Sequence, residues 1–195
     1  MLDETAVVLR AKQGDPEAFA TLVRRHEELA FRVAYLIVRD AAEAEDVAQE
    51  GFVRAYRSLR RFDARRPFRP WLLRIVTNLA INSRRSARRR DATAERVERD
   101  IRHRSMADVA DDAAQAEEAR RVWEAVATLR PEEQTLVYLR YFLDVSEAEA
   151  AAAIGRPVGT AKSRLHRALR RLRDVIQQRY PDLARPVGEA TKTGA

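Results

Sequence analysis

Apolar residues recur three or four positions apart along most of this chain, which is the spacing that gives an α-helix one apolar face. The first such run follows Asp15-Pro16-Glu17, where Asp is a preferred N-cap and Pro is preferred at the first helical position. The chain has only 6 Gly and 7 Pro in 195 residues, which disfavours a turn-rich β-fold. We therefore expect an all-α fold.

The helical runs form two groups, which predicts two small helical domains joined by a flexible linker. The first domain is expected over 16–90, after an N-terminal segment 1–15, with a Pro-containing loop at 60–69 before its third helix. Residues 91–116 lose the apolar period and are predicted to be the linker, roughly 30 Å end to end and about 85 Å when stretched. The second domain is expected over 117–180, and 181–195 are expected to form a C-terminal tail.

Basic residues are concentrated in two blocks. Residues 57–90 hold 12 Arg against one acid, and residues 156–173 hold six Arg and one Lys against none. Because the net charge of the whole chain is only +7, the remainder is net acidic. Two basic blocks on an acidic background are typical of a protein that contacts a polyanion at two places.

The second block contains a predicted helix-turn-helix over 146–165. A short Ala-rich helix ends at Gly155, which suits a turn with positive φ, and a second helix follows from Val158 or Gly159. Small Ala150 and Ala151 permit close packing of the two helices. The second helix is predicted to bury an inner stripe of Ala161, Leu165, Ala168, Leu172 and Ile176. This leaves a basic and hydroxylic face outside, as a recognition helix in the major groove requires. The alternative is an ordinary helical hairpin with a solvated basic face.

The first block interleaves Arg with Phe62, Phe68 and Trp71. Aromatic faces can stack on unpaired bases while guanidinium groups hold phosphates, which suggests single-strand binding. Under the alternative interpretation the aromatic side chains belong to the core and Arg solvates its rim.

Four acids (Glu43, Glu45, Asp46 and Glu50) begin the predicted helix 43–59 without a base before Arg54. They either favour the helix dipole or form a docking face for another protein.

Several functional classes are disfavoured. The chain has no Cys and three scattered His, and His26-Glu27-Glu28-Leu29-Ala30 lacks the second His of a zinc-binding HExxH motif. We expect no catalytic residues, no metal and no cofactor. The most apolar window, 29–38, is too short to span a bilayer and contains Arg32, and the start lacks a secretory signal. A cytoplasmic protein without membrane insertion is expected.

Three stretches together resemble the extracytoplasmic-function (ECF) subfamily of the bacterial sigma-70 family. They are 44–56 (AEDVAQEGFVRAY), 68–80 (FRPWLLRIVTNLA) and 159–168 (GTAKSRLHRA), in the order of that family. The resemblance implies a sigma factor that binds core RNA polymerase, recognises the −35 and −10 promoter elements and promotes DNA melting. It implies three partners: the clamp helices of the largest polymerase subunit, promoter DNA and an anti-sigma factor.

The resemblance also implies roles for individual residues. Contacts to polymerase are implied for Asp46, Gln49, Glu50 and Phe52. The loop that receives an extruded −10 base would be lined by Arg65, Arg66 and Phe68, with Trp71, Arg74, Asn78 and Asn82 beside it. Contacts to the −35 element are expected from Arg156, Thr160, Lys162, Ser163, Arg164, Arg167 and Arg171.

Two other functions remain open from the residues. One is a helix-turn-helix regulator that binds duplex DNA without polymerase, for which the Arg and aromatic block at 57–90 would have no use. The other is an RNA-binding or nucleic-acid-modifying enzyme, which needs titratable groups converging in a pocket. The sequence predicts no such group.

Overall fold

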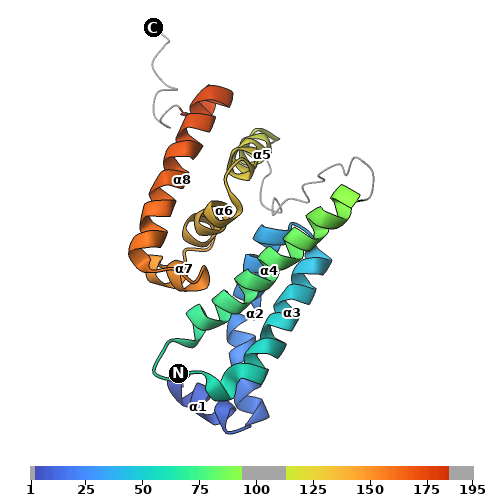
Figure 1. Ribbon diagram of the computed structural model, residues 1–195, viewed down its shortest axis with the longest axis vertical. Helices are drawn as coiled ribbons and strands as arrows, with labels where there is room; N and C mark the ends of the chain where they lie inside the picture. The colour runs from blue at the N-terminus through green and yellow to red at the C-terminus, as the bar shows by residue number, and fades with distance from the viewer. Residues whose placement is uncertain (1–2, 94–112, 185–195) are drawn as a thin grey trace.

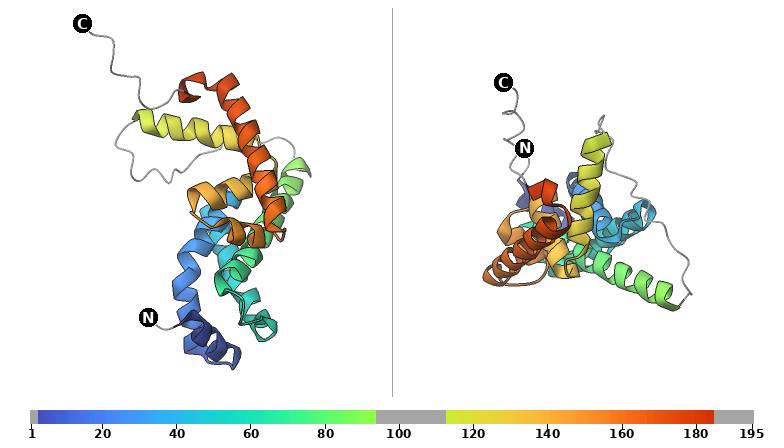
Figure 2. Two further views of the ribbon diagram at one scale, coloured as in Figure 1. Left: turned by 90° about the vertical axis from the view of Figure 1, so that its left-hand side faces the viewer. Right: turned by 90° about the horizontal axis from the view of Figure 1, so that it is seen from above.

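A computed structural model describes residues 3–93 and 113–184, and all regular elements in these ranges are helices (Figures 1 and 2). The N-terminal group comprises α1 (Glu4–Lys12), α2 (Pro16–Val38), α3 (Ala41–Ser58), the short 3-10 helix η1 (Leu59–Arg61) and α4 (Phe68–Thr93). The C-terminal group comprises α5 (Ala113–Ala127), α6 (Pro131–Val137), the π-helical turn η2 (Tyr138–Phe142), α7 (Glu147–Ala153), α8 (Val158–Arg179) and the 3-10 helix η3 (Pro181–Ala184). The all-α prediction is confirmed for the described residues.

An aspartate begins each of the first three helices. The side chain of Asp3 accepts a hydrogen bond from Thr5 N, that of Asp15 from two backbone N–H groups of α2, and that of Asp40 from Glu43 N. Each carboxylate satisfies N–H groups that have no partner within the helix, and its charge suits the positive end of the helix dipole. The helix start predicted at Asp15 is therefore confirmed.

The three long helices of the N-terminal group surround one core. Leu22 and Val33 of α2 and Leu72 and Val76 of α4 are at most 1% exposed. Gly51 allows α3 to approach α4 closely, because a Cβ at this position would lie 2.8 Å from Cγ2 of Val76. This packing holds α4 in place and thereby sets the position of the loop 62–67 that precedes it.

The C-terminal group contains the predicted helix-turn-helix. Ser146 and Glu149 form a reciprocal capping box at the start of α7. Gly155 has φ +65° in the turn that leads to α8, as the sequence predicted. Ala150 and Ala151 are each 1% exposed, so the close helix packing expected of them is also confirmed.

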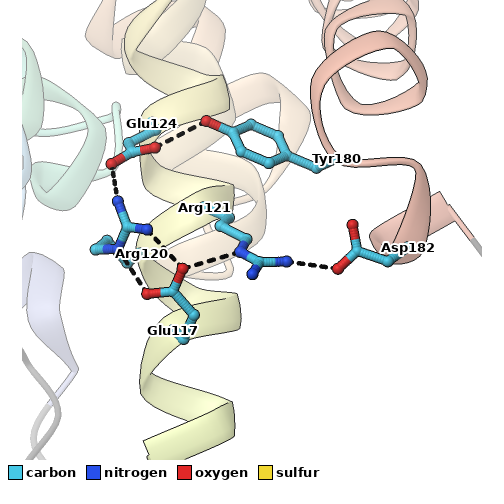
Figure 3. Close-up of polar contacts among 6 residues, drawn as sticks. All are labelled: Glu117, Arg120, Arg121, Glu124, Tyr180 and Asp182. Carbon is cyan, nitrogen blue, oxygen red and sulfur yellow. Dashed lines mark hydrogen bonds and ion pairs between the residues drawn. The ribbon is translucent and has the colours of Figure 1, made fainter.

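A polar network joins α5 to the end of α8 and to η3 (Figure 3). Arg120 and Arg121 donate to the Glu117 carboxylate and thereby lower its pKa to about 2. Arg121 also reaches Asp182 on η3 at 2.5 Å. The hydroxyl of Tyr180 donates to Glu124 at 2.8 Å, and this hydrogen bond raises the pKa of the phenol. The network orients α5 against the C-terminal end of α8.

Some boundaries differ from the sequence expectation. The segment 1–15 contains a full helix, α1, which was not expected. Helix α4 begins at Phe68 rather than near Pro70, so the proline lies in the first turn, where its missing N–H costs no helical bond. Of the predicted linker 91–116, residues 94–112 lie outside the described residues, and so do residues 185–195 of the predicted tail.

The two groups pack against each other through α4 and α7, which lie side by side (Figure 1). Arg84 of α4 donates to Oε1 of Gln134 on α6 at 2.7 Å, and Arg32 of α2 donates to the carbonyl of Phe142 at 3.4 Å. Within the described ranges no helix is long and apolar enough to cross a bilayer.

Candidate nucleic-acid interface

Helix α8 presents the polar face that the sequence predicted. Ala161, Leu165 and Ala168 are buried against the rest of the C-terminal group, as expected for the inner stripe. The opposite face carries four of the predicted −35 contacts. Lys162, Ser163 and Arg167 are exposed, and Thr160 is half-buried in the first turn: these are the donors that a helix in the major groove would use.

Acids of α6 hold the other three predicted −35 residues. The Glu132 carboxylate contacts the Arg164 guanidinium and lies 3.7 Å from Nη2 of Arg156. The neighbouring Glu133, whose side chain is only 9% exposed, accepts two hydrogen bonds from Arg171 at 2.8 and 2.9 Å. All three of these predicted −35 residues are therefore ion-paired within the C-terminal group in this structure.

The two acids that hold these arginines differ in exposure. Glu132 is 42% exposed, so a phosphate oxygen can replace its carboxylate on Arg164 or Arg156. Glu133 is buried and also accepts from the backbone N–H of Arg130, so it joins Arg171 to the start of α6. The sequence Arg130-Pro131-Glu132-Glu133 predicts the start of a helix, and α6 begins there, but the pattern does not show that the two acids pair with arginines of the basic block.

The aromatic side chains near the loop 62–67 belong mainly to the core. Phe62 is 5% exposed and Phe68 is 1% exposed, and their ring centroids lie 6.0 Å apart at 90°. Trp71 is half-buried, with its ring 4.5 Å from that of Phe62. The Phe68 ring, for which the resemblance implied a place in the lining of the base-binding loop, is therefore packed in the core in this structure.

Polar side chains occupy the surface above this aromatic cluster. Arg65 and Arg66 are exposed at the loop tip, where Asp63 lies 3.7 Å from Nε of Arg66. Along α4, Arg74, Asn78 and Asn82 are exposed at intervals of four residues, which places them on one face. This surface presents guanidinium and amide groups together with the exposed part of Trp71.

Beneath the loop, a buried histidine connects three helices. Nε2 of His26 on α2 lies 2.9 Å from Oε1 of Glu4 on α1, and its ring lies 5.4 Å from that of Phe68 on α4. Burial lowers the pKa of His26, and this effect exceeds the opposing effect of its hydrogen bond to Glu4. A neutral imidazole is therefore favoured in this position.

Helix α3 carries the predicted polymerase contacts with mixed outcomes. Asp46 and Gln49 are exposed, and Glu50 is held by Arg54 at 2.7 Å. Phe52 is 8% exposed, so its ring belongs to the core and little of it is available for the contact that the resemblance implied.

Two exposed apolar side chains on α3 were missed. Val53 is 41% exposed and Tyr56 is 50% exposed, with the Tyr56 ring 4.9 Å from that of Phe19. Tyr56 lies at helical spacing from Phe52 and Leu59, which are both buried, so spacing alone predicts that it is buried too. Their position beside Arg54 and Arg57 does not mark them as exposed, because Ala55 also lies beside Arg54 and is buried.

The two candidate nucleic-acid surfaces meet where α4 packs on α7. Nε of Arg69 lies 3.5 Å from Oε1 of Glu149, and the Arg74 guanidinium lies over Gly155, 3.4 Å from where a Cβ would stand. Arg74 therefore contacts the turn of the helix-turn-helix.

Comparison with known proteins matches these two groups separately. Residues 22–90 match the family model for sigma-70 region 2, and residues 119–172 match that for sigma-70 region 4. The chain is 32% identical to the ECF RNA polymerase sigma factor SigW of Bacillus subtilis, over 87% of this chain and 95% of that protein. It is 34% identical to the ECF RNA polymerase sigma factor SigL of Mycobacterium tuberculosis, over 85% of this chain and 94% of that protein.

Solved structures show the same arrangement of helices. CnrH, in complex with the cytosolic domain of CnrY, is similar with a TM-score of 0.65 and 27% identity, over 91% of this chain and 99% of that chain. RpoE of Bartonella quintana, in complex with the anti-sigma factor NepR, shares the fold with a TM-score of 0.62 and 22% identity, over 82% of this chain and 96% of that chain.

Proposed function

Because this chain belongs to the ECF subfamily of the sigma-70 family, we propose that it directs core RNA polymerase to promoters by holding the DNA at two separated points. The observation that carries the proposal is the pair of family matches, each of which coincides with one basic helical group. Residues 16–90 of the N-terminal group act as region 2, and residues 117–180 of the C-terminal group act as region 4. RNA synthesis is the chemistry of the polymerase, and this chain contributes none.

The helix-turn-helix binds the −35 element as duplex. Helix α8 enters the major groove with Thr160, Lys162 and Ser163 toward base edges, and Arg167 toward the phosphates. Arg156 and Arg164 exchange the Glu132 carboxylate for phosphate oxygens. Arg171 stays on Glu133 and supports the fold of the group.

The loop 62–67 and the outer face of α4 bind the −10 element as it melts. Arg65 and Arg66 hold the backbone of the unpaired strand, while Arg74, Asn78 and Asn82 supply hydrogen bonds along α4. The exposed part of Trp71 offers a stacking surface in place of Phe68. Extrusion of a base costs a few kcal/mol, so these contacts must supply a comparable free energy.

The polymerase binds the outer face of α3. Asp46 and Gln49 are available for polar contacts there, and Val53 and Tyr56 provide apolar area beside them. Once the polymerase and one promoter element are bound, the second element binds at a high effective concentration because the two groups are covalently joined. The groups must separate first, because Arg74 contacts the turn at Gly155.

Location and regulation follow from this assignment. The protein works in the cytoplasm, where the polymerase meets DNA. CnrH binds the cytosolic domain of CnrY and the RpoE of Bartonella quintana binds the anti-sigma factor NepR, which supports an anti-sigma factor for this chain as well. The helix-turn-helix regulator is not favoured, because the region 2 match accounts for the Arg-rich block that a regulator would not need.

Reconstitution tests the proposal. The purified chain is mixed with core RNA polymerase and a library of promoter fragments, and run-off transcripts are sequenced. The promoter fragments that give transcripts are then treated with permanganate, which reacts with unpaired thymines. We expect transcripts that share two upstream elements and reactive thymines in the downstream one. Binding of duplex fragments without polymerase, together with no transcript, would instead support the regulator.

A further inference from the structure

The loop 62–67 is shaped by short-range bonds at its tip. Arg66 N donates to the carbonyl of Asp63 at 2.9 Å, and Arg65 N donates to its carboxylate at 3.1 Å. These bonds form a turn within the loop without attaching it to another element. The rings of Phe62 and Phe68 pack in the core at the two ends of the loop, so a further anchor on its backbone would fix the course of the loop between them.

Lys12, the last residue of α1, supplies such an anchor. Its Nζ donates to the carbonyl of Phe62 at 2.5 Å, and the bond is partly buried. The carbonyl belongs to the first residue of the loop, fifty positions along the chain. A charged donor makes this a stronger bond than one between neutral groups, and burial reduces competition from water.

Helix α1 is itself firmly seated, so its last residue has a defined position. Val7, Val8 and Ala11 are at most 4% exposed. At the start of the helix, Glu4 is bonded to His26, whose ring in turn lies beside Phe68 at the far end of the loop. Helix α1 is thus connected to both ends of the loop. Lys12 bonds to the carbonyl of Phe62, and Glu4 bonds to His26, whose ring lies beside that of Phe68.

The residue type at position 12 suits this geometry. Among the 37 basic residues of the chain only 3 are Lys, and Lys12 is the one that precedes the linker. An ammonium on a slender stem can approach one carbonyl in a confined space, whereas a planar guanidinium is shaped to pair with two oxygens. Lys12 is therefore suited to holding a single backbone oxygen.

We infer that α1 positions the base-binding loop for single-strand capture and that Lys12 is the positioning residue. This inference rests on the proposed function. Lys12 does not touch DNA; it holds the backbone of Phe62 so that Arg65 and Arg66 are already in place when a base is extruded. Ordering the loop beforehand removes an entropic cost from the capture step.

Three variants separate this role from general stability. Lys12→Met keeps the stem and removes the donor, Lys12→Arg keeps a cationic donor, and Arg10→Met is the matched control on the same helix, where it breaks the ion pair to Asp15. In holoenzyme on a promoter selected by run-off, we expect Lys12→Met to lower permanganate reactivity about tenfold, the size of one charge-assisted hydrogen bond. Lys12→Arg should restore part of it, and affinity for core polymerase should be unchanged in all three.

Hydrogen exchange of the free chain provides a readout that needs no polymerase. Lys12→Met should speed exchange at residues 62–66 while leaving α8 unchanged, and Arg10→Met should not. Unchanged exchange in the loop, or an equal loss of melting in Arg10→Met, overturns the inference. Failure of the wild-type holoenzyme to melt any promoter counts against the proposed function instead, and the exchange data still decide whether Lys12 holds the loop.

Discussion

The guanidinium carbon of Arg39 lies 3.9 Å from the centroid of the Trp123 ring, and the same side chain donates to the hydroxyl of Tyr138 at 2.8 Å. Arg39 ends α2, whereas both aromatic residues belong to the C-terminal group. It also has φ +66°, a left-handed conformation that is uncommon for a residue with a side chain. One residue therefore both terminates a helix and joins the two groups.

Replacing this residue should loosen the contact between the groups. Arg39→Gly removes the cation–π contact, about 0.5–1 kcal/mol at an exposed site, together with the bond to Tyr138, while glycine suits the left-handed backbone. We expect a larger radius of gyration by small-angle X-ray scattering with no loss of helical circular dichroism. Arg24→Ala is the control: it removes an exposed arginine within α2, and alanine preserves the helix. An unchanged radius in Arg39→Gly contradicts this prediction.

Tethering the two groups should block promoter opening. The chain has no Cys, so Arg69→Cys with Glu149→Cys introduces the only thiols, at the contact between α4 and α7. A short bifunctional methanethiosulfonate should join them, abolish permanganate reactivity at a promoter and release activity again on reduction. The two single-cysteine chains treated in the same way are the controls. Full activity of the cross-linked chain would show that the groups need not separate.

The adjacent acids of α6 should differ in their effect on stability. Glu133→Gln weakens two hydrogen bonds from Arg171 at a side chain that is 9% exposed, and we expect a loss of about 1–3 kcal/mol in urea unfolding. Glu132→Gln is the matched control: it should change stability little and raise affinity for non-cognate duplex, because Arg164 is freed. Equal losses of stability from both substitutions would contradict the prediction that Glu133 supports the fold and Glu132 does not.

Stability should fall in mildly acidic solution because of His26. Burial lowers its pKa below the ordinary 6.5, so the unfolded chain binds more protons than the folded one in that range. The contribution of neutral His26 to the free energy of unfolding is fully present above about pH 6.5, and it is lost as pH falls toward the lowered pKa of the folded state. Urea unfolding at pH 7.5 and pH 5.5 should show this decrease, and His26→Gln should reduce it. The same decrease in the variant would assign it to other groups.

Charge reversal on α3 should separate polymerase binding from folding. Asp46→Arg changes an exposed residue of the proposed docking face and should abolish co-purification with core polymerase. Glu118→Arg makes the same charge change at an exposed position of α5 and should co-purify normally. Both chains should keep the wild-type thermal midpoint. Retained binding by Asp46→Arg would remove this face from the proposal.

Local features of the fold could be predicted because a few neighbouring residues encode them. Asp15 caps α2, Gly155 turns between α7 and α8, and Ala161 and Leu165 form the inner stripe, all as expected. Spacing and capping depend on chemistry within one or two helical turns, which the sequence displays directly. Helix α1 was missed because its apolar residues, Val7, Val8 and Ala11, form only a short run.

The site was only partly predictable, because each role depends on which distant residues meet. Arg65 and Lys162 are exposed, as residues that contact DNA must be. Phe52 and Phe68 instead lie in the core, and Arg171 is paired with Glu133. An aromatic residue suits a core or a stacked base equally well by type, and only its neighbours decide between them.

The amino-acid sequence by itself determined that this protein is helical, where its helices turn and which two segments are basic, since these depend on residue types at short spacing. Tertiary structure alone decided that Lys12 meets the carbonyl of Phe62, that Arg39 meets Trp123 and that Arg74 covers Gly155. Each of these contacts joins residues at least fifty positions apart. Their meeting depends on the packing of whole helices, and no local pattern encodes it.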